Sequence, residues 1–234
     1  MILERIKYVM MKNQFLKSFF QPMYRLAMKP GVLKQNYLFK RYGLEAIQKL
    51  NNVFEKENIE YWLEFGTLLG AVREKNFIEH DLDIDIGLFI DNDSDKIEQL
   101  LTMAGFKKIQ QIEVDNGSFA LEQTYQYRGV TVDLFYFTKI DNMMYCHVFT
   151  GEYGKSWEST IEDNGGLVVY QHAFPYKGLK KIKFLKMNFT IPSNEIEHLT
   201  AQYGNDFMVK DKNWNPYVMA PNKTILIDKK GIVK

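Results

Sequence analysis

The segment from Glu64 to Asp85, EFGTLLGAVREKNFIEHDLDID, constrains the fold most, because it joins a glycine-rich turn to three acids at alternate positions. Alternate side chains of an extended strand share one face, so the pattern predicts that Asp81, Asp83 and Asp85 face one site. Like charges this close require water, a basic partner or a cation, and magnesium prefers such oxygen ligands. The segment therefore indicates metal-assisted chemistry on phosphate, and the alternative is an edge strand whose acids face water.

The turn ahead of these acids favours the phosphate interpretation. Gly66 and Gly70 allow close approach of the backbone, and Thr67 lies where a helix start would offer amide donors. Arg73 supplies a forked cation that matches phosphate oxygens. We expect these residues to cradle phosphate beside the acids.

A second acidic strand is predicted in GVTVDLFYF, residues 129–137. Asp133 lies between Val132 and Leu134, and burying an unpaired carboxylate costs several kcal/mol. A cation held by Asp83 and Asp85 would compensate this cost, so we expect the two strands to lie side by side. The alternative partners for Asp133 are a lysine or a nearby backbone amide.

The bulk composition predicts one compact body. A chain of 234 residues with 46% hydrophobic content can form one sizeable core, alone or with a small appendage. The single cysteine, Cys146, excludes an internal disulfide framework and a cysteine-rich zinc site. No apolar run approaches the roughly 18 residues of a membrane span, and no secretory signal is recognised. We expect a cytoplasmic protein.

The charge is unevenly distributed. Residues 1–44 contain nine lysines and arginines and one acid, Glu4; the totals of 30 and 29 leave 21 basic and 28 acidic residues for 45–234. Apolar residues at three-, four- and seven-residue steps predict a basic amphipathic helical arm over 1–42, which Pro22 should kink or restart. The arm would contact an anionic membrane at its inner face or pack on the body.

The remaining pattern predicts alternating elements in a catalytic body, residues 43–234. A helix over 43–57 presents Leu44, Ile47 and Leu50 on one side. Further expected elements are a strand at 61–65, a helix from a Ser94 cap to residue 104, strands at 106–112 and 118–127, and a helix that Pro192 and Ser193 start and Gly204 ends.

Four blocks of sequence resemble the LicD and fukutin family of the nucleotidyltransferase superfamily, especially the catalytic domain of fukutin-related protein. The resemblance covers roughly residues 45–220, and the order and spacing of its blocks make it specific. The blocks are GTLLGAVR (66–73), FIEHDLDIDIGLF (77–89), VDLFYF (132–137), and IPSNEIEHLTAQYGNDF (191–207) followed by NWNP (213–216).

The resemblance implies an α/β fold, a nucleotidyltransferase-like mixed sheet flanked by helices. It implies an enzyme, dependent on Mg²⁺ or Mn²⁺, that moves a phospho-alcohol from a CDP-alcohol donor to a sugar hydroxyl of a glycan or lipid-linked glycan. The alcohol would be choline, ribitol, glycerol or a similar one, in cell-surface or capsular polysaccharide synthesis.

The resemblance also assigns roles by position. Asp83 and Asp85 become metal ligands, Asp133 becomes the third carboxylate, as ligand or general base, and Asp81 becomes the leading acid. The glycine-rich turn, with Arg73, would bind the donor phosphates. The chain departs from the family at His80, where tryptophan is usual; we expect His80 to contact the donor. The zinc element of fukutin-related protein has no counterpart, so no zinc is expected.

Two other functions fit part of the pattern. A nucleotidyltransferase that transfers NMP from an NTP to a small molecule or protein would use the same acids, although the 17-residue step from Gly66 to Asp83 is longer than is usual there. A catalytically inactive module could tether a complex to a membrane or polyanion through the basic arm, although its acid set is intact. Nucleic acid is not an expected partner, because the body is acidic and lacks a basic aromatic motif.

Overall fold

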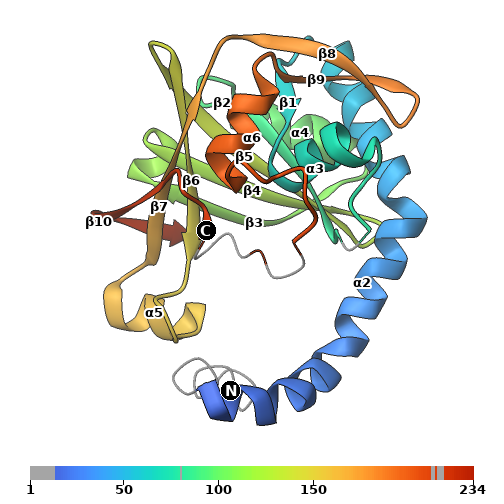
Figure 1. Ribbon diagram of the computed structural model, residues 1–234. Coiled ribbons are helices and arrows are strands. Elements are labelled where there is room, and N and C mark those ends of the chain that lie inside the picture. The colour runs from blue at the N-terminus through green and yellow to red at the C-terminus, as the bar shows by residue number, and fades with distance from the viewer. Residues whose placement is uncertain (1–13, 80, 212–213, 215–218) are drawn as a thin grey trace.

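A computed structural model describes residues 14–79, 81–211, 214 and 219–234 (Figure 1). Side chains are described from residue 31 onward. The first part of the basic arm, His80 and most of the NWNP block lie outside these residues. The predicted donor contact of His80 therefore stays a prediction.

One long helix, α2 (Gln14–Lys56), replaces the two helices predicted for this region. It continues through Pro22 and through the predicted domain boundary at residue 43, so the predicted restart at Pro22 was wrong. Good helix formers such as leucine, methionine, alanine and lysine surround the proline and favour continuation. Within the described ranges, no helix combines the length and apolar character needed to cross a bilayer.

The two ends of α2 have different surroundings. Residues 31–35 are exposed, and Figure 1 shows this part of the helix extending away from the body. Contact with the core begins at Phe39 and includes Ile47 and Leu50, which are fully buried. Leu44 was predicted to share their face, but it is 45% exposed. The helix is therefore both a projecting arm and a wall of the core.

The body contains the remaining helices and strands in a mixed α/β order, as predicted. The helices are α3 (Phe65–Leu69), continued by a π-helical turn (Gly70–Glu74), α4 (Ser94–Met103), α5 (Trp157–Asn164) and α6 (Glu195–Tyr203). The strands are β1 (Tyr61–Leu63), β2 (Asp83–Phe89), β3 (Lys107–Val114), β4 (Ala120–Tyr127), β5 (Val130–Ile140), β6 (Met143–Thr150), β7 (Leu167–Pro175), β8 (Leu179–Phe184), β9 (Met187–Pro192) and β10 (Lys223–Val233).

The main sheet is mixed and folds back on itself. Its strand order is β1-β2-β5-β4-β3-β10-β7-β6, and β6 also pairs with β5. Strands β5, β4, β3, β10, β7 and β6 therefore form a closed ring. Strand β2 joins this ring by parallel pairing with β5, while its pairing with β1 is antiparallel.

The main core packs against this sheet and includes residues of helices α2, α3, α4 and α6. Ile84 and Ile86 of β2 are fully buried, as are Val132 and Leu134 of β5, in one cluster with residues of α2 and α4. Alternation along the strands places the acids of β2 and β5 on the opposite face. The apolar residues thus fix the direction in which the acidic ones point.

Helix ends show how local sequence places the elements around β2. Asp93, rather than the predicted Ser94, caps α4: its carboxylate accepts from the backbone N–H of Asp95 at 3.1 Å and of Lys96 at 3.0 Å. A carboxylate at this position satisfies donors that the helix start leaves free. At the other end of the chain, Gly204 follows α6, which ends at Tyr203 as predicted, and has a φ of +86°.

Candidate metal and donor site

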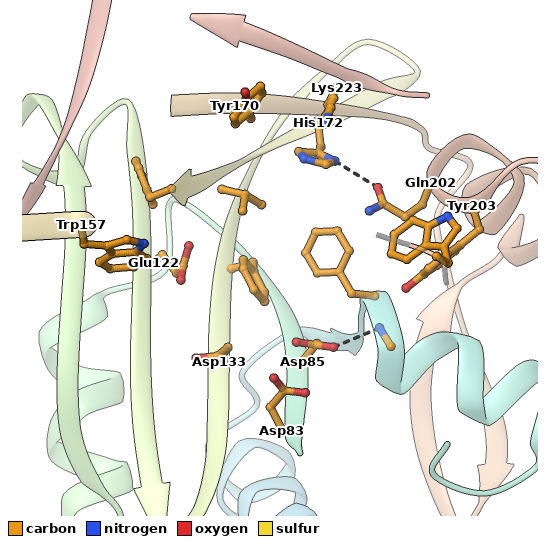
Figure 2. Close-up of a pocket in the computed structure, with 16 residues that line it drawn as sticks. Asp83, Asp85, Glu122, Asp133, Trp157, Tyr170, His172, Gln202, Tyr203 and Lys223 are labelled. Atoms are coloured by element: carbon orange, nitrogen blue, oxygen red, sulfur yellow. Dashed lines mark hydrogen bonds between the residues drawn. The ribbon is translucent and has the colours of Figure 1, made fainter. Parts of the chain in front are cut away.

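Three carboxylates meet where β2 and β5 lie in parallel. Asp85 pairs directly with Asp133, and Asp83 lies two residues before Asp85 on the same face. One oxygen from each lies within 4.8 Å of the other two. Figure 2 shows these carboxylates below a cavity. The prediction that the two acidic strands lie side by side is therefore confirmed.

Hydrogen bonds hold two of these carboxylates in place. The backbone N–H of Gly66 donates to Asp85 Oδ2 at 3.0 Å, and the N–H of Asp85 donates to Thr67 Oγ1 at 2.9 Å. The Thr124 hydroxyl donates to Asp133 Oδ1 at 2.6 Å. The start of α3 thus orients Asp85, and strand β4 orients Asp133. In each of these two carboxylates, one oxygen accepts the hydrogen bond named above and the other can contact a bound ion.

The electrostatics of the cluster favour a bound cation. Burial raises the pKa of Asp133 to about 7, against its bond from Thr124. Burial also raises the pKa of Asp83, and it raises that of Asp85 well above its usual range, with repulsion from Asp83 and Asp133 adding to the effect. Three hard oxygen donors that repel one another suit a divalent cation such as magnesium or manganese. The residues present therefore fit a metal.

Asp81 is not a member of this group. Strand β2 begins only at Asp83, so Asp81 precedes the strand on which the pattern placed it. Its carboxylate still lies beside that of Asp85, since a Cβ at Gly66 would be 3.7 Å from Asp81 Oδ1 and 3.2 Å from Asp85 Oδ2. The Asp81 carboxylate instead accepts from the backbone N–H of Ile78 at 3.2 Å. Burial and repulsion from Asp83 raise its pKa to about 7. Asp81 therefore adds a titratable group beside the cluster from the segment that precedes β2.

Most of the predicted phosphate cradle has other contacts. Thr67 is fully buried under Asp85, and a Cβ at Gly70 would lie 2.7 Å from the carbonyl oxygen of Asn76, so Gly70 permits close packing. Arg73 donates to Glu74 at 3.1 Å and to the carbonyl oxygen of Phe207 at 3.0 Å. Of the residues predicted to cradle phosphate, only Gly66 lines the cavity. The other three support the site from behind.

The cavity above the carboxylates has a volume of about 330 Å³. Its opposite side carries polar groups: the His172 ring contacts Gln202 Oε1 at 3.0 Å, and Lys223 Nζ lies 5.1 Å from the centre of the Tyr170 ring. Between these two sides the walls are aromatic. The aromatic lining residues are Phe65, Phe135, Phe149, Trp157, Tyr170, Tyr203 and Trp214.

A fourth carboxylate in this cavity, Glu122, was not predicted. It pairs with Phe135 across β4 and β5, two positions from the pair of Thr124 with Asp133, and so lies on the face of the acids. Its Oε2 is shielded from solvent and has no hydrogen-bond partner among the described residues. Burial, followed by repulsion from Asp133, raises its pKa well above its usual range. A polar residue in an alternating strand normally indicates a solvated face, and here the closed ring covers it.

A buried polar group behind the cavity was also not predicted. Glu64 accepts from the Trp62 indole N–H at 2.6 Å and contacts His198 Nε2 at 2.7 Å; the side chains of Glu64 and His198 are each 1% exposed. The His198 ring stacks on Phe174 at 4.1 Å. This group joins α6 to the start of α3, where the N–H of Gly66 meets Asp85.

Comparison with known families identifies the family to which this arrangement belongs. A model of the family described as LicD/FKTN/FKRP, nucleotidyltransferase domain, matches residues 58–194. The chain belongs to this family. The matched range contains β2 and β5 with their acids and the glycine-rich turn. Membership confirms the resemblance read from the sequence motifs, and it supports the predicted class of enzyme, a LicD-type transferase.

Curated relatives extend the match over more of the chain. The human protein named ribitol-5-phosphate transferase FKTN is 25% identical over 188 residues, 79% of this chain and 37% of the relative. An uncharacterised protein of Rickettsia prowazekii is 29% identical over 68% of this chain and 53% of its own length. Human ribitol 5-phosphate transferase FKRP is 39% identical over 56 residues, 24% of this chain. The chain spans little more than a third of the FKTN proteins it matches.

Proposed function

We propose that this protein transfers a phospho-alcohol from a CDP-alcohol to a sugar hydroxyl of a glycan or lipid-linked glycan. The observation that carries the proposal is the meeting of Asp83, Asp85 and Asp133 at one edge of an aromatic cavity, in a chain of this family. The names of the FKTN and FKRP relatives make ribitol phosphate the first candidate. Choline and glycerol phosphates are the other alcohols to test.

We assign a divalent cation, Mg²⁺ or Mn²⁺, to the three carboxylates. When bound, the cation would neutralise charge on the donor diphosphate and on the departing CMP. The protein supplies the geometry: Gly66 and Thr67 hold Asp85, and Thr124 holds Asp133. These contacts preorganise the carboxylates, so little reorganisation is needed when the donor arrives.

The cavity walls would hold the organic parts of the donor. Aromatic rings offer stacking surfaces for a flat base, and the His172–Gln202 pair and Lys223 offer polar contacts on the side away from the acids. We propose that the donor spans the cavity, with its diphosphate at the carboxylates. The predicted direct phosphate contact of Arg73 would require that Arg73 leave Phe207, so we assign it a supporting role.

A donor panel tests the function directly. The full chain is mixed with Mg²⁺ or Mn²⁺ and with CDP-ribitol, CDP-glycerol or CDP-choline, and CMP is measured with and without oligosaccharide acceptors. Release of CMP that requires the metal supports the proposal. Release of pyrophosphate from an NTP, without CMP from any CDP-alcohol, would instead establish an NMP transferase. A titration showing no metal binding with the donor present would favour an inactive tethering module.

We also propose that the arm contacts an anionic membrane. The charge excess of residues 1–44 and the exposure of Lys34, Lys40 and Arg41 support this proposal. Flotation with vesicles that contain anionic lipid tests it, with neutral vesicles as the control. Equal recovery with both vesicles would contradict the proposal and leave the transferase activity unaffected.

A further inference from the structure

Among the described carboxylates that line the cavity, Glu122 alone lies outside the three-oxygen group. Asp83, Asp85 and Asp133 offer oxygens within 4.8 Å of one another, and Glu122 is not in this group. Glu122 is displaced from Asp133 by one strand and by two positions along the strand. Two positions of a strand correspond to roughly 6 to 7 Å. Glu122 therefore faces the same cavity from a separate place.

The contacts of the two groups also differ. Asp133 Oδ1 accepts from Thr124, and Asp133 belongs to the three-oxygen group to which we assign the cation. Glu122 Oε2 has none among the described residues. Buried polar atoms without partners are rare in folded proteins and call for an explanation such as a catalytic role. The sequence alone left open whether Asp133 is a metal ligand or a general base. With Asp133 among the proposed ligands, Glu122 becomes the candidate for the base.

We propose that Glu122 is the general base that accepts the proton of the attacking hydroxyl. The inference rests on the proposed function. In this step the acceptor oxygen forms a bond to the phosphorus that carries the alcohol, and the bond from that phosphorus to the bridging oxygen breaks. CMP departs with the electron pair, and the hydroxyl proton moves to the Glu122 carboxylate. The acceptor therefore enters on the β4 side of the metal group, beside Trp157 and Phe149.

The replacement Glu122→Gln tests this role, because glutamine keeps the shape and cannot accept the proton. We expect kcat for CMP release from CDP-ribitol to fall by about 10²- to 10⁴-fold, with the KM for the donor and the Mg²⁺ affinity measured by calorimetry unchanged. CMP release is measured with the oligosaccharide acceptor of the donor panel and also without it, so that attack by water is scored separately. The matched control is Glu113→Gln, on the neighbouring strand β3, whose carboxylate contacts Lys234 Nζ at 3.0 Å and does not line the cavity; its rate should be unchanged.

A second variant separates a base from a structural residue. In Glu122→Ala, added formate should restore CMP release in proportion to its concentration, because a small carboxylate can occupy the vacated space. Full activity of Glu122→Gln, or absence of rescue in a folded Glu122→Ala protein, would overturn the inference. A loss of Mg²⁺ affinity equal to that of Asp85→Asn would also overturn it, by making Glu122 a ligand. If the unmodified protein releases no CMP from any CDP-alcohol, the proposed function itself fails.

Discussion

Asp85 and Asp133 are direct partners in the parallel pairing of β2 with β5. Each is flanked along its strand by fully buried apolar residues, Ile84 and Ile86 for Asp85 and Val132 and Leu134 for Asp133. The core therefore holds two carboxyl groups side by side, and a bound cation would relieve their repulsion when they are ionised.

Replacing Asp85 with asparagine should abolish metal-dependent CMP release without unfolding the metal-free protein. The change removes a proposed metal ligand. It also removes a carboxyl group whose pKa is raised by burial and by its acidic neighbours. We expect at least a 10²-fold loss of activity and a free energy of unfolding in EDTA no lower than that of the unmodified protein. The control Asp163→Asn alters an exposed ion pair with Lys155 and should keep activity. Full activity of Asp85→Asn would contradict the metal site.

The metal-free protein should lose stability as pH rises from about 4 to about 7. The pKa of Asp81 and that of Asp133 are raised to about 7 in the folded protein, above the unfolded value of about 3.9. The folded state therefore binds more protons than the unfolded state in this interval, so deprotonation destabilises it. Above about pH 7 this contribution levels off, and Mg²⁺ should restore stability there.

Urea unfolding in EDTA at pH 5 and pH 8 measures this effect. His147 acts in the opposite direction, because burial lowers its pKa to about 4, so the comparison should be between the unmodified protein and Asp133→Asn. The variant should show a smaller loss of stability between the two pH values. Identical pH profiles for the two proteins would contradict the prediction.

Replacing Gly70 with alanine should destabilise the fold by about 1 to 3 kcal/mol. The new Cβ would lie 2.7 Å from the carbonyl oxygen of Asn76, a backbone atom that cannot move alone. Gly31→Ala is the matched control, since no atom lies within 4 Å of its added Cβ and the glycine lies in helix α2. Alanine there should stabilise by about 0.5 to 1 kcal/mol. Equal effects at both positions, measured by urea unfolding, would count against this packing role.

Replacing Arg73 with methionine should lower stability by about 1.5 to 3 kcal/mol while leaving the KM for the donor unchanged. The side chain is 10% exposed and donates to the Phe207 carbonyl, so its loss leaves a carbonyl without its donor. Arg128→Met breaks an exposed pair with Glu45 and should cost about 0 to 1 kcal/mol. A raised KM in Arg73→Met with unchanged stability would instead restore the direct phosphate contact expected from the sequence.

The sequence predicted the centre of the site because its physical signal is local. Asp133 between Val132 and Leu134 requires a compensating partner. The alternating acids before Ile86 predict that partner, a cation held between the two strands. Those two observations were sufficient to pair β2 with β5. Asp81 lies before the strand rather than in it, because alternation alone does not show where a strand begins; the backbone N–H of Asp81 donates to the Ile78 carbonyl oxygen there.

The features that the sequence missed depend on distant contacts. Glu122 alternates with apolar and aromatic residues on β4, as in a solvated strand, and only the pairing of β6 with β5 encloses it. Glu64 precedes the glycine-rich turn like any helix cap, and its contact with His198 joins residues far apart in the chain. The contacts of Gly70 with Asn76 and of Arg73 with Phe207 could not be foreseen for a similar reason, and the phosphate roles expected for these two residues stay predictions.

The parallel pairing of β2 with β5 has a consequence for biosynthesis. Parallel neighbours cannot be joined by a tight hairpin, and here α4, β3 and β4 intervene between them. A growing chain that ends before Asp133 contains two of the three carboxylates to which we assign the cation and cannot complete the cluster. Binding of the proposed cation would therefore follow assembly of the sheet, and ion uptake would report that this part of the molecule is complete.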